Sequence, residues 1–373
     1  MDRRAFLHFP LAGTVLAATT ADLPAYRVVS RFKPAGAPGM PGAFPGRVVS
    51  LHSARSIDEQ TGRADPAVVR EMLVRGMTAL TGEATPDGAW RRFFDASDTV
   101  GIKVNCSGAP QVCSNPVVVA EIARNLVAAG VKPANIYIYE RFGDQLASVG
   151  YQKYVPEGVH VLAIETPRGN IRGYDPSTYV EVDFFGEEDT RSNMVRLVTS
   201  TFTKVINVPN MKDHGASGVT GCLKNVAYGN FSNVARSHQN TKTNTLSFIG
   251  TLAGVEPLRS KTVLQVMDGL KGVWHGGPFV RDPRFAFYPK QIVVGTDPVA
   301  IDRQLLDIIE EKRRAEHAVS VWDRSMEHIS DKHPLDPNFN AFIREPGHIE
   351  FAGRLGLGVY DQKKIRHSKI EVA

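Results

Sequence analysis

Short aliphatic runs and longer amphipathic stretches alternate along most of the chain. Runs bounded by Gly, Pro or Asp predict strands at residues 48–53, 99–105, 135–140, 159–165, 202–208, 261–268 and 291–296. Amphipathic stretches with a Pro in the first turn predict helices at residues 65–82, 114–130 and 297–314. Because strand, helix and strand follow one another at the usual spacing, we predict an α/β fold with a mainly parallel sheet flanked by helices.

Two segments depart from this alternation. Residues 165–195 predict an inserted lobe that bears a hairpin, and a lobe placed over a crevice would act as a lid. Residues 33–46 are almost wholly Pro, Gly and Ala, a composition typical of a tether. We therefore divide the chain into a signal peptide at 1–25, a Pro/Gly-rich tether at 26–46 and a single large domain at 47–373.

The first residues resemble a twin-arginine export signal. Arg3 and Arg4 precede a short, weakly apolar run that ends in small residues. A buried helix that begins with two arginines is the alternative, although Pro10 and Gly13 weaken such a helix. The signal predicts an exported, periplasmic protein that meets the twin-arginine translocase. A stable membrane span is not expected, because it needs about 20 apolar residues.

The composition excludes several classes of protein. Hydrophobic residues make up 42% and charged residues 22% of the chain, which is ordinary for a globular enzyme. The formal net charge is only +5, and no run of Lys and Arg forms the stripe that binding to nucleic acid needs. The cysteines form no CxxC pair, so neither a zinc ribbon nor a ferredoxin-type cluster is predicted. A disulfide between Cys106 and Cys113 stays open.

Polar and basic residues follow the predicted strands, which is where parallel sheets place their ligand crevice. Lysine and arginine supply charge there, and unhindered glycine N–H groups supply directed donors, so the pattern predicts a site for an anionic small molecule or cofactor. One such lysine alone is more often a solvated surface charge, but the shared position after strands favours a site. The predicted binding residues are Lys103, Asn105, Arg141, Lys212, Lys224, Arg236, Gly276 and Gly277.

Two histidines in Gly- and Asn-rich loops are candidates for acid and base chemistry. His214 and His238 are the predicted catalytic residues, because imidazole transfers protons near neutral pH. Each would otherwise be a hydrogen-bonded loop residue. A mixed site for a transition metal is a further hypothesis, with Cys106, Asp213, His214 and Cys222 as ligands. No spacing such as HExxH enforces that site.

Residues 218–225, GVTGCLKN, admit two interpretations. The segment either enters a helix whose N-terminal amides face an anion, or forms a tight turn with Cys222 as a small buried hydrophobe. Another hypothesis gives the glycine-rich loops a folding role alone, with Lys212 or Lys224 paired to the acidic residues 187–189. Asp297 is interpreted as a helix cap and not as a catalytic group.

Several separate motifs, in this order, resemble those of the domain of unknown function 362 family. They are GIKVNC, SNP, NVPNMKDHGASGVTGCLKN, GNFSNVARSH, MDGLKGVWHGGP, TDPVAID and GLGVYD, spread from about Val100 to Tyr360. The resemblance implies no activity, and the family's lysine and histidine motif positions correspond to Lys103, Lys212, His214 and Lys224. Some relatives carry appended ferredoxin-like cluster domains, for which this chain lacks the cysteines.

Two functions are consistent with the sequence. The first is an exported enzyme that binds an anionic small molecule or cofactor at the strand ends. Redox or metal-dependent chemistry is suggested by the export route, which carries folded proteins with their cofactors, and by the relatives with cluster domains. The second is a periplasmic accessory protein that captures a metal or an anion without turnover. The sequence specifies neither the substrate nor the cofactor.

Overall fold

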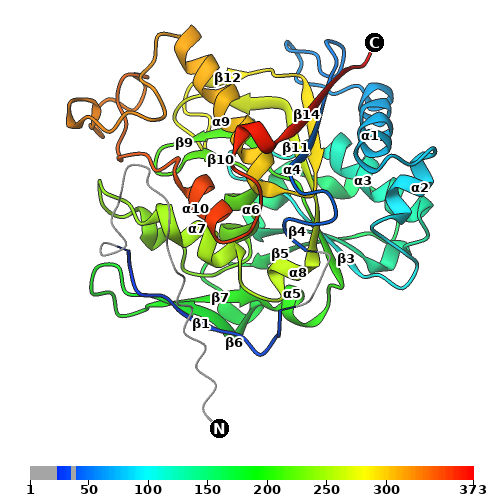
Figure 1. Ribbon diagram of the computed structural model, residues 1–373, viewed down its shortest axis with the longest axis horizontal. Coiled ribbons are helices and arrows are strands. Elements are labelled where there is room, and N and C mark those ends of the chain that lie inside the picture. The colour runs from blue at the N-terminus through cyan, green and yellow to red at the C-terminus, as the bar shows by residue number, and fades with distance from the viewer. Residues whose placement is uncertain (1–22, 35–38) are drawn as a thin grey trace.

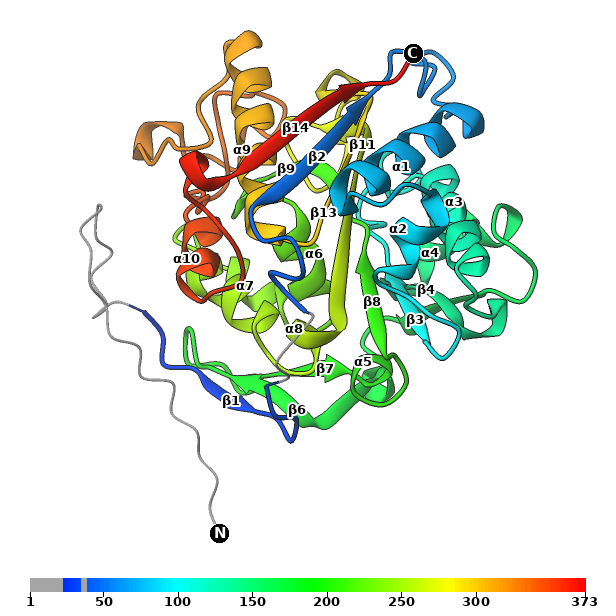
Figure 2. The ribbon, with the colours of Figure 1, turned by 45° about the vertical axis from the view of Figure 1, so that its right-hand side comes forward.

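The structure, a computed structural model, describes residues 23–34 and 39–373. Its main sheet follows the path β14-β2-β13-β11-β8-β3-β4-β5, whose strands are labelled between them in Figure 1 and Figure 2. Neighbours on this path are parallel except where β13 is involved, so the predicted α/β fold with a mainly parallel sheet is confirmed. The strands are β2 (Arg47–His52), β3 (Val100–Lys103), β4 (Ile136–Phe142), β5 (His160–Glu165), β8 (Lys204–Asn207), β11 (Thr262–Val273), β13 (Gln291–Gly295) and β14 (Arg366–Glu371).

Helices cover both faces of the main sheet (Figure 2). On one face α1, α2 and α3 pack against side chains such as Ile102 and Val294, and on the other α6, α7, α9 and α10 pack against Val205 and Val293. Successive strand residues point to opposite faces, which is why Val293 and Val294 enter different cores. The helices are α1 (Pro66–Thr81), α2 (Pro86–Arg91), α3 (Pro116–Ala128), α4 (Gly143–Val149), α5 (Arg196–Ser200), α6 (Cys222–Gly229), α7 (Thr245–Ala253), α8 (Leu258–Lys261), α9 (Pro298–Ala315) and α10 (His348–Arg354).

The predicted caps fix the starts of the two longest helices. Asp65 accepts hydrogen bonds from the first backbone amides of α1, and Asp297 accepts one from the Ala300 amide of α9. Asp297 also accepts the amides of Gly46 and Val359, so it joins distant parts of the chain to α9. The interpretation of Asp297 as a cap is confirmed.

A second, three-stranded sheet contains the predicted hairpin. β6 (Tyr174–Glu181) and β7 (Arg191–Val195) pair antiparallel, and β1 (Arg27–Val29) pairs with the other edge of β6. Figure 2 shows this sheet below α7 and α8. The prediction of a hairpin within residues 165–195 is therefore confirmed.

The described parts of the predicted tether are packed against the domain. β1 pairs with β6, and Met40 is buried, with its backbone N–H donating to the Arg259 carbonyl oxygen at 2.9 Å. These parts of residues 26–46 belong to the folded body rather than to a free linker. The predicted signal peptide at 1–25 falls almost wholly outside the described residues. Within the described ranges, none of the helices has both the length and the apolar character that a bilayer span needs.

Candidate functional site

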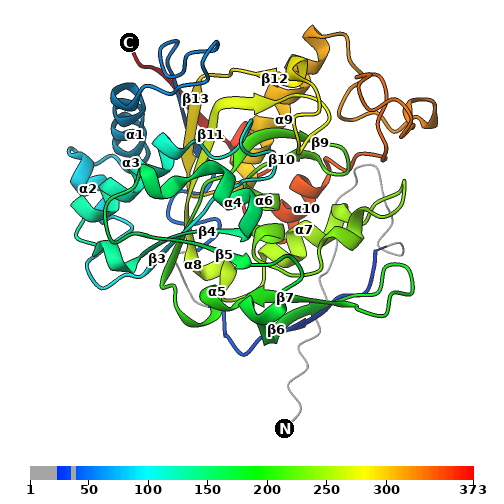
Figure 3. The same ribbon diagram turned by 180° about the vertical axis from the view of Figure 1, so that it is seen from behind.

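A cavity of about 560 Å³ lies beyond the carboxyl ends of β3 and β4. The hairpin of β9 (Asn210–His214) and β10 (Gly218–Thr220), helix α6 and the segment 330–342 form its other walls. Figure 3 shows this segment, in orange, on the same side of the molecule as β9 and β10. Of the residues predicted from sequence, those that line the cavity are Lys103, Asn105, Arg141, His214, Lys224, His238, Gly276 and Gly277.

Two of the predicted cations are already paired where they line the wall. Lys103 and Glu140, at the ends of β3 and β4, form a buried ion pair with 2.8 Å between Nζ and Oε1. Residue 229 is Gly, and a Cβ there would lie 2.1 Å from Lys103 Cε, so the glycine leaves room for the lysine in this position. Arg141 Nε lies 2.7 Å from Glu165 Oε1. These pairs shape and stiffen the wall rather than leaving free positive charge.

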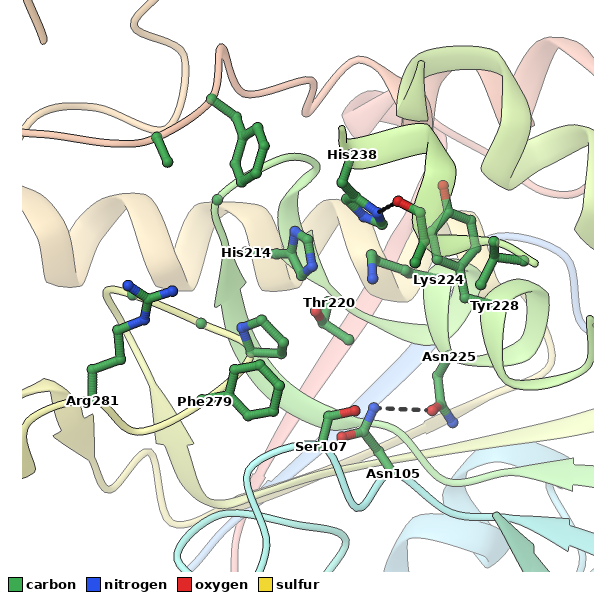
Figure 4. A pocket seen from close by; sticks show the side chains of 18 of the residues that line it. Asn105, Ser107, His214, Thr220, Lys224, Asn225, Tyr228, His238, Phe279 and Arg281 are labelled. Carbon is green, nitrogen blue, oxygen red and sulfur yellow. Dashed lines mark hydrogen bonds between the residues drawn. The ribbon is translucent and has the colours of Figure 1, made fainter. Parts of the chain in front are cut away.

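Lys212 lies behind the cavity wall. Its buried ammonium donates to Asn105 Oδ1 at 2.7 Å and to the carbonyl oxygens of Ser107 and Val112. Asn105 in turn donates to Asn225 Oδ1 at 3.0 Å (Figure 4). Burial lowers the pKa of Lys212 to about 8. The sequence predicted that Lys212 contacts the ligand directly. In the structure it instead orients the cavity wall through these hydrogen bonds.

Lys224 reaches the cavity with no carboxylate or hydrogen-bond acceptor of the described residues beside it. It stands on α6, its residue surface is 8% exposed, and its Nζ lies 4.5 Å from the centroid of the Tyr228 ring. Among the described residues its ammonium makes neither a hydrogen bond nor an ion pair. Desolvation, followed by the charge of Lys212, lowers the pKa of Lys224 to about 7. An ammonium in this position is stabilised by an anion that enters the cavity.

Two neutral histidines converge on Lys224 with complementary tautomers (Figure 4). His214 Nδ1 accepts two backbone N–H groups of the following turn, at 3.1 and 3.3 Å, so its Nε2 carries the proton. His238 Nδ1 donates to the Ala235 carbonyl oxygen at 3.2 Å, so its Nε2 is an acceptor, and it has no partner among the described residues. Burial lowers the pKa of His238 to about 3 and holds that of His214 well below its ordinary range. The cavity therefore receives one imidazole donor and one imidazole acceptor.

Two more residues of the cavity lining have a buried polar atom without a partner among the described residues. His275 Nδ1 accepts from Arg313 Nη1 at 3.1 Å, so the His275 proton is on Nε2. Neither this Nε2 nor the hydroxyl of Thr220 has a hydrogen-bond partner in the described part of the chain. Buried polar groups are normally paired, so unpaired donors that line one cavity point to a ligand.

The predicted metal ligands are not assembled around one point. Asp213 faces Arg344, whose Nη1 lies 3.2 Å from Asp213 Oδ1, and it accepts the Gly277 amide. Cys106 is buried beside Tyr151. Across the described ranges, no group of three or more His, Cys, Asp or Glu side chains could hold a metal ion. The cysteines, all within those ranges, are free, so no disulfide joins Cys106 to its neighbour at 113.

The segment GVTGCLKN combines its two predicted interpretations. It enters α6, and the amides of Cys222 and Leu223 donate to the Asp302 carboxylate at 2.6 and 2.9 Å. Burial raises the pKa of Asp302 to about 7. The helix amides therefore face a carboxyl group of the protein itself rather than a ligand. Cys222, as the second interpretation held, is fully buried among apolar side chains.

Arg236 lies outside the cavity and anchors the hairpin. Its guanidinium donates to the Val182 carbonyl oxygen at 2.7 Å and lies 3.4 Å from Glu187 Oε1. The acidic segment therefore meets Arg236, and in the described chain neither Lys212 nor Lys224 pairs with it as the folding-only hypothesis required. Residues 165–195, all of them described, contribute nothing to the cavity lining, so the hairpin is not a lid over it.

Several lining residues were missed by reasoning from sequence. Glu140 ends an apolar run and Asn225 follows Lys224, so their positions were a usable signal. The segment 330–342 carries no periodic pattern, so the sequence gave no signal that it lines a cavity. It is held over the cavity by Asn340 Nδ2, which donates to the Gly215 carbonyl oxygen at 2.7 Å.

These features define an α/β protein with a cavity of lysine and histidine at the carboxyl edge of a mostly parallel sheet. The chain belongs to the DUF362 family, whose model, described as a domain of unknown function, matches residues 100–307, more than half of the sequence. The match ends before Tyr360, the end predicted from the motifs. It contains the strands and helix α6 that carry Lys103, His214 and Lys224, whereas the segment 330–342 follows it.

The other comparisons add little. No curated protein matches the chain. A crystal structure of a Thermotoga maritima protein, determined as a target of the Northeast Structural Genomics Consortium, matches with 11% sequence identity and a TM-score of 0.37. The match covers 68% of this chain and 59% of that one, which is less than two thirds of its length.

Proposed function

We propose that the cavity binds a small organic anion and that the protein is an enzyme that acts on it. The proposal is carried by the unpaired, desolvated ammonium of Lys224. Leaving such a charge buried without a counter-ion destabilises the fold, whereas a bound anion removes the penalty and gains a short-range ion pair.

The remaining charges of the wall leave this position open to an anion. Lys103 and Arg141 are paired with Glu140 and Glu165. Arg281 and Asp331 line the cavity but are exposed to solvent. The neutral donors His214, His275 and Thr220 add directed hydrogen bonds without adding charge. A small anion therefore finds one cation and several donors, which supports orientation as well as attraction.

Turnover is favoured over storage by His238. Its unprotonated Nε2 presents a lone pair to the cavity, and a lone pair repels a bound anion. An acceptor in that place weakens simple capture. A bound anion beside it raises the low pKa of His238, so that its Nε2 can take a proton from the ligand. A protein that only captures an anion, without turnover, would have no use for the acceptor of His238. The redox or metal-dependent chemistry suggested by the sequence is not part of this proposal.

Iodide, a general anion, tests the site without knowledge of the natural ligand. Anomalous diffraction from iodide-soaked crystals is expected to place an ion beside Lys224 in the wild-type protein and none there in Lys224→Met. Lys153→Met, which changes an exposed lysine, is the matched control and should keep the ion. Iodide found on the outer surface while the cavity stays empty would show that the site assignment is wrong.

Export by the twin-arginine route is a separate part of the proposal. Arg3 and Arg4, followed by the short apolar run, support it. Replacing both with Lys in the full chain should leave the protein in the cytoplasm, as measured by cell fractionation. Unchanged export of this variant, or export through a translocase-deficient strain, would contradict the route.

A further inference from the structure

Lys224 has the surroundings of a nucleophile as well as those of a binding group. A lysine can attack carbon only as the neutral amine, and a buried lysine reaches that form more readily. With a pKa of about 7, roughly half of Lys224 is neutral at pH 7, against less than about one part in a thousand of an ordinary lysine. Its Nζ is held by no hydrogen bond from the described residues, so its lone pair is free to react.

We propose that Lys224 forms an imine with the carbonyl carbon of a 2-oxo acid bound in the cavity. The inference rests on the proposed function, since the carboxylate of this ligand is the anion that the cavity holds. It goes further in giving Lys224 a covalent role and in naming the class of ligand as an anionic carbonyl compound.

The unpaired donors of the wall match the carboxylate of such a ligand. His214, His275 and Thr220 line the cavity, and among the described residues no acceptor pairs with His275 Nε2–H, with the Thr220 hydroxyl or with His214 Nε2–H. A carboxylate has two oxygens that accept several hydrogen bonds, and it can use these donors together. Lys224 is then left to meet the adjacent carbonyl carbon. The carboxylate's charge stabilises the imine once the imine nitrogen has taken up a proton.

His238 supplies the proton transfers that the step needs. The Nζ lone pair attacks the carbonyl carbon, the C–N bond forms, and the carbonyl oxygen becomes a hydroxyl by taking up the proton released from nitrogen. The neutral carbinolamine then loses its hydroxyl with a proton as water, and the C=N bond forms. The acceptor His238 Nε2, which converges with Lys224 in Figure 4, can carry the proton from nitrogen to oxygen. Amine and ketone thus give imine and water, with no oxidant or reductant.

The cavity walls favour the loss of water. Rings of Phe142, Phe339 and Phe342 line it together with the segment that covers it. An apolar, partly closed site disfavours the return of water to the imine and raises the amine fraction of Lys224.

Reductive trapping tests the imine. The full chain is incubated with pyruvate and sodium cyanoborohydride at pH 7, and peptide mass spectrometry locates the adduct. We expect Lys224 to react at least about tenfold faster than any exposed lysine, because its amine fraction is far larger. Lys153→Met should keep the Lys224 adduct, and Lys224→Met should lose it. Adducts confined to exposed lysines, or the same total yield in Lys224→Met, would overturn the proposal.

Two controls separate this inference from the proposed function. Lactate, which has the carboxylate but no carbonyl, should bind in calorimetry and slow trapping by pyruvate without forming an adduct. Lys224→Arg keeps the positive charge but has no amine that can attack carbon, so it should yield no adduct with pyruvate. Lactate binding without any pyruvate adduct in the wild type overturns the imine but leaves the anion site standing. Absence of both overturns the imine and counts against the anion site.

Discussion

Replacing Lys224 with Met should stabilise the protein at neutral pH. The native pKa of Lys224 is about 7, whereas its ordinary value is 10.5, so between these values the unfolded chain binds more protons than the folded one. The free energy of unfolding therefore rises with pH across this window. Below pH 7 the destabilisation caused by Lys224 is present in full, and above about pH 10.5 it is absent. Met keeps the length and the apolar stem of the side chain and has no charge to desolvate.

The size of the effect follows from the shift. One pKa unit corresponds to about 1.4 kcal/mol, so Lys224 lowers the free energy of unfolding by roughly 4 kcal/mol at pH 7 and by roughly 2 kcal/mol at pH 9. Structural relaxation and entry of water reduce both figures. We expect Lys224→Met to gain about 1–2 kcal/mol more over the wild type at pH 7 than at pH 9.

Urea unfolding at the two pH values, followed by circular dichroism in the absence of added anions other than chloride, measures this difference. Lys153→Met is the control for loss of a lysine and should show no such pH-dependent gain. Lys212→Met should instead lose about 1–3 kcal/mol, because it leaves the carbonyl oxygens of Ser107 and Val112 without their donor. A Lys224→Met variant less stable than the wild type at both pH values would refute the view that its charge is buried without compensation.

Other positions give independent predictions. Arg236→Met should lower the free energy of unfolding by about 2–4 kcal/mol and speed proteolysis of residues 165–195. Lactate affinity in calorimetry should stay unchanged, and weaker lactate binding would contradict the position of Arg236 outside the cavity. Glu140→Gln should lower the free energy of unfolding by about 3–5 kcal/mol in urea, because the buried charge of Lys103 loses its partner, and a wild-type value would count against the ion pair. Gly229→Ala should lower the thermal midpoint in calorimetry, because its methyl group displaces Lys103, and an unchanged midpoint would mean that the lysine is not confined.

The fold could be predicted from sequence because its signals are local. The aliphatic runs between Gly, Pro and Asp became strands of the main sheet, and Asp65 and Asp297 became caps, since each depends only on neighbours in the chain. The tether was different. Its Pro and Gly content hid the contact of Met40 with Arg259, which depends on residues far along the chain.

The site was predictable only in part, for a related reason. Position after a strand predicted a shared location for Lys103, His214 and Lys224, because parallel strands end at one edge of a sheet, and all three line one cavity. It could not tell a paired from an unpaired lysine. Lys103 is paired with Glu140, and Lys212 donates to Asn105. Both are tertiary contacts, which the local sequence does not show. Arg236 followed the same loop pattern but points to the hairpin.

The pKa of Lys224 itself is the most direct test of an unpaired cation that awaits an anion. It can be followed by carbon NMR of ¹³C-lysine-labelled protein, with the Lys224 signal assigned by its loss in Lys224→Met. We predict that Lys224 titrates near pH 7 in the free protein and shifts upward when lactate is added, since a bound carboxylate favours the ammonium. Titration near the ordinary lysine value of about 10.4 in the free protein, or no shift at saturating lactate, would contradict the proposed site.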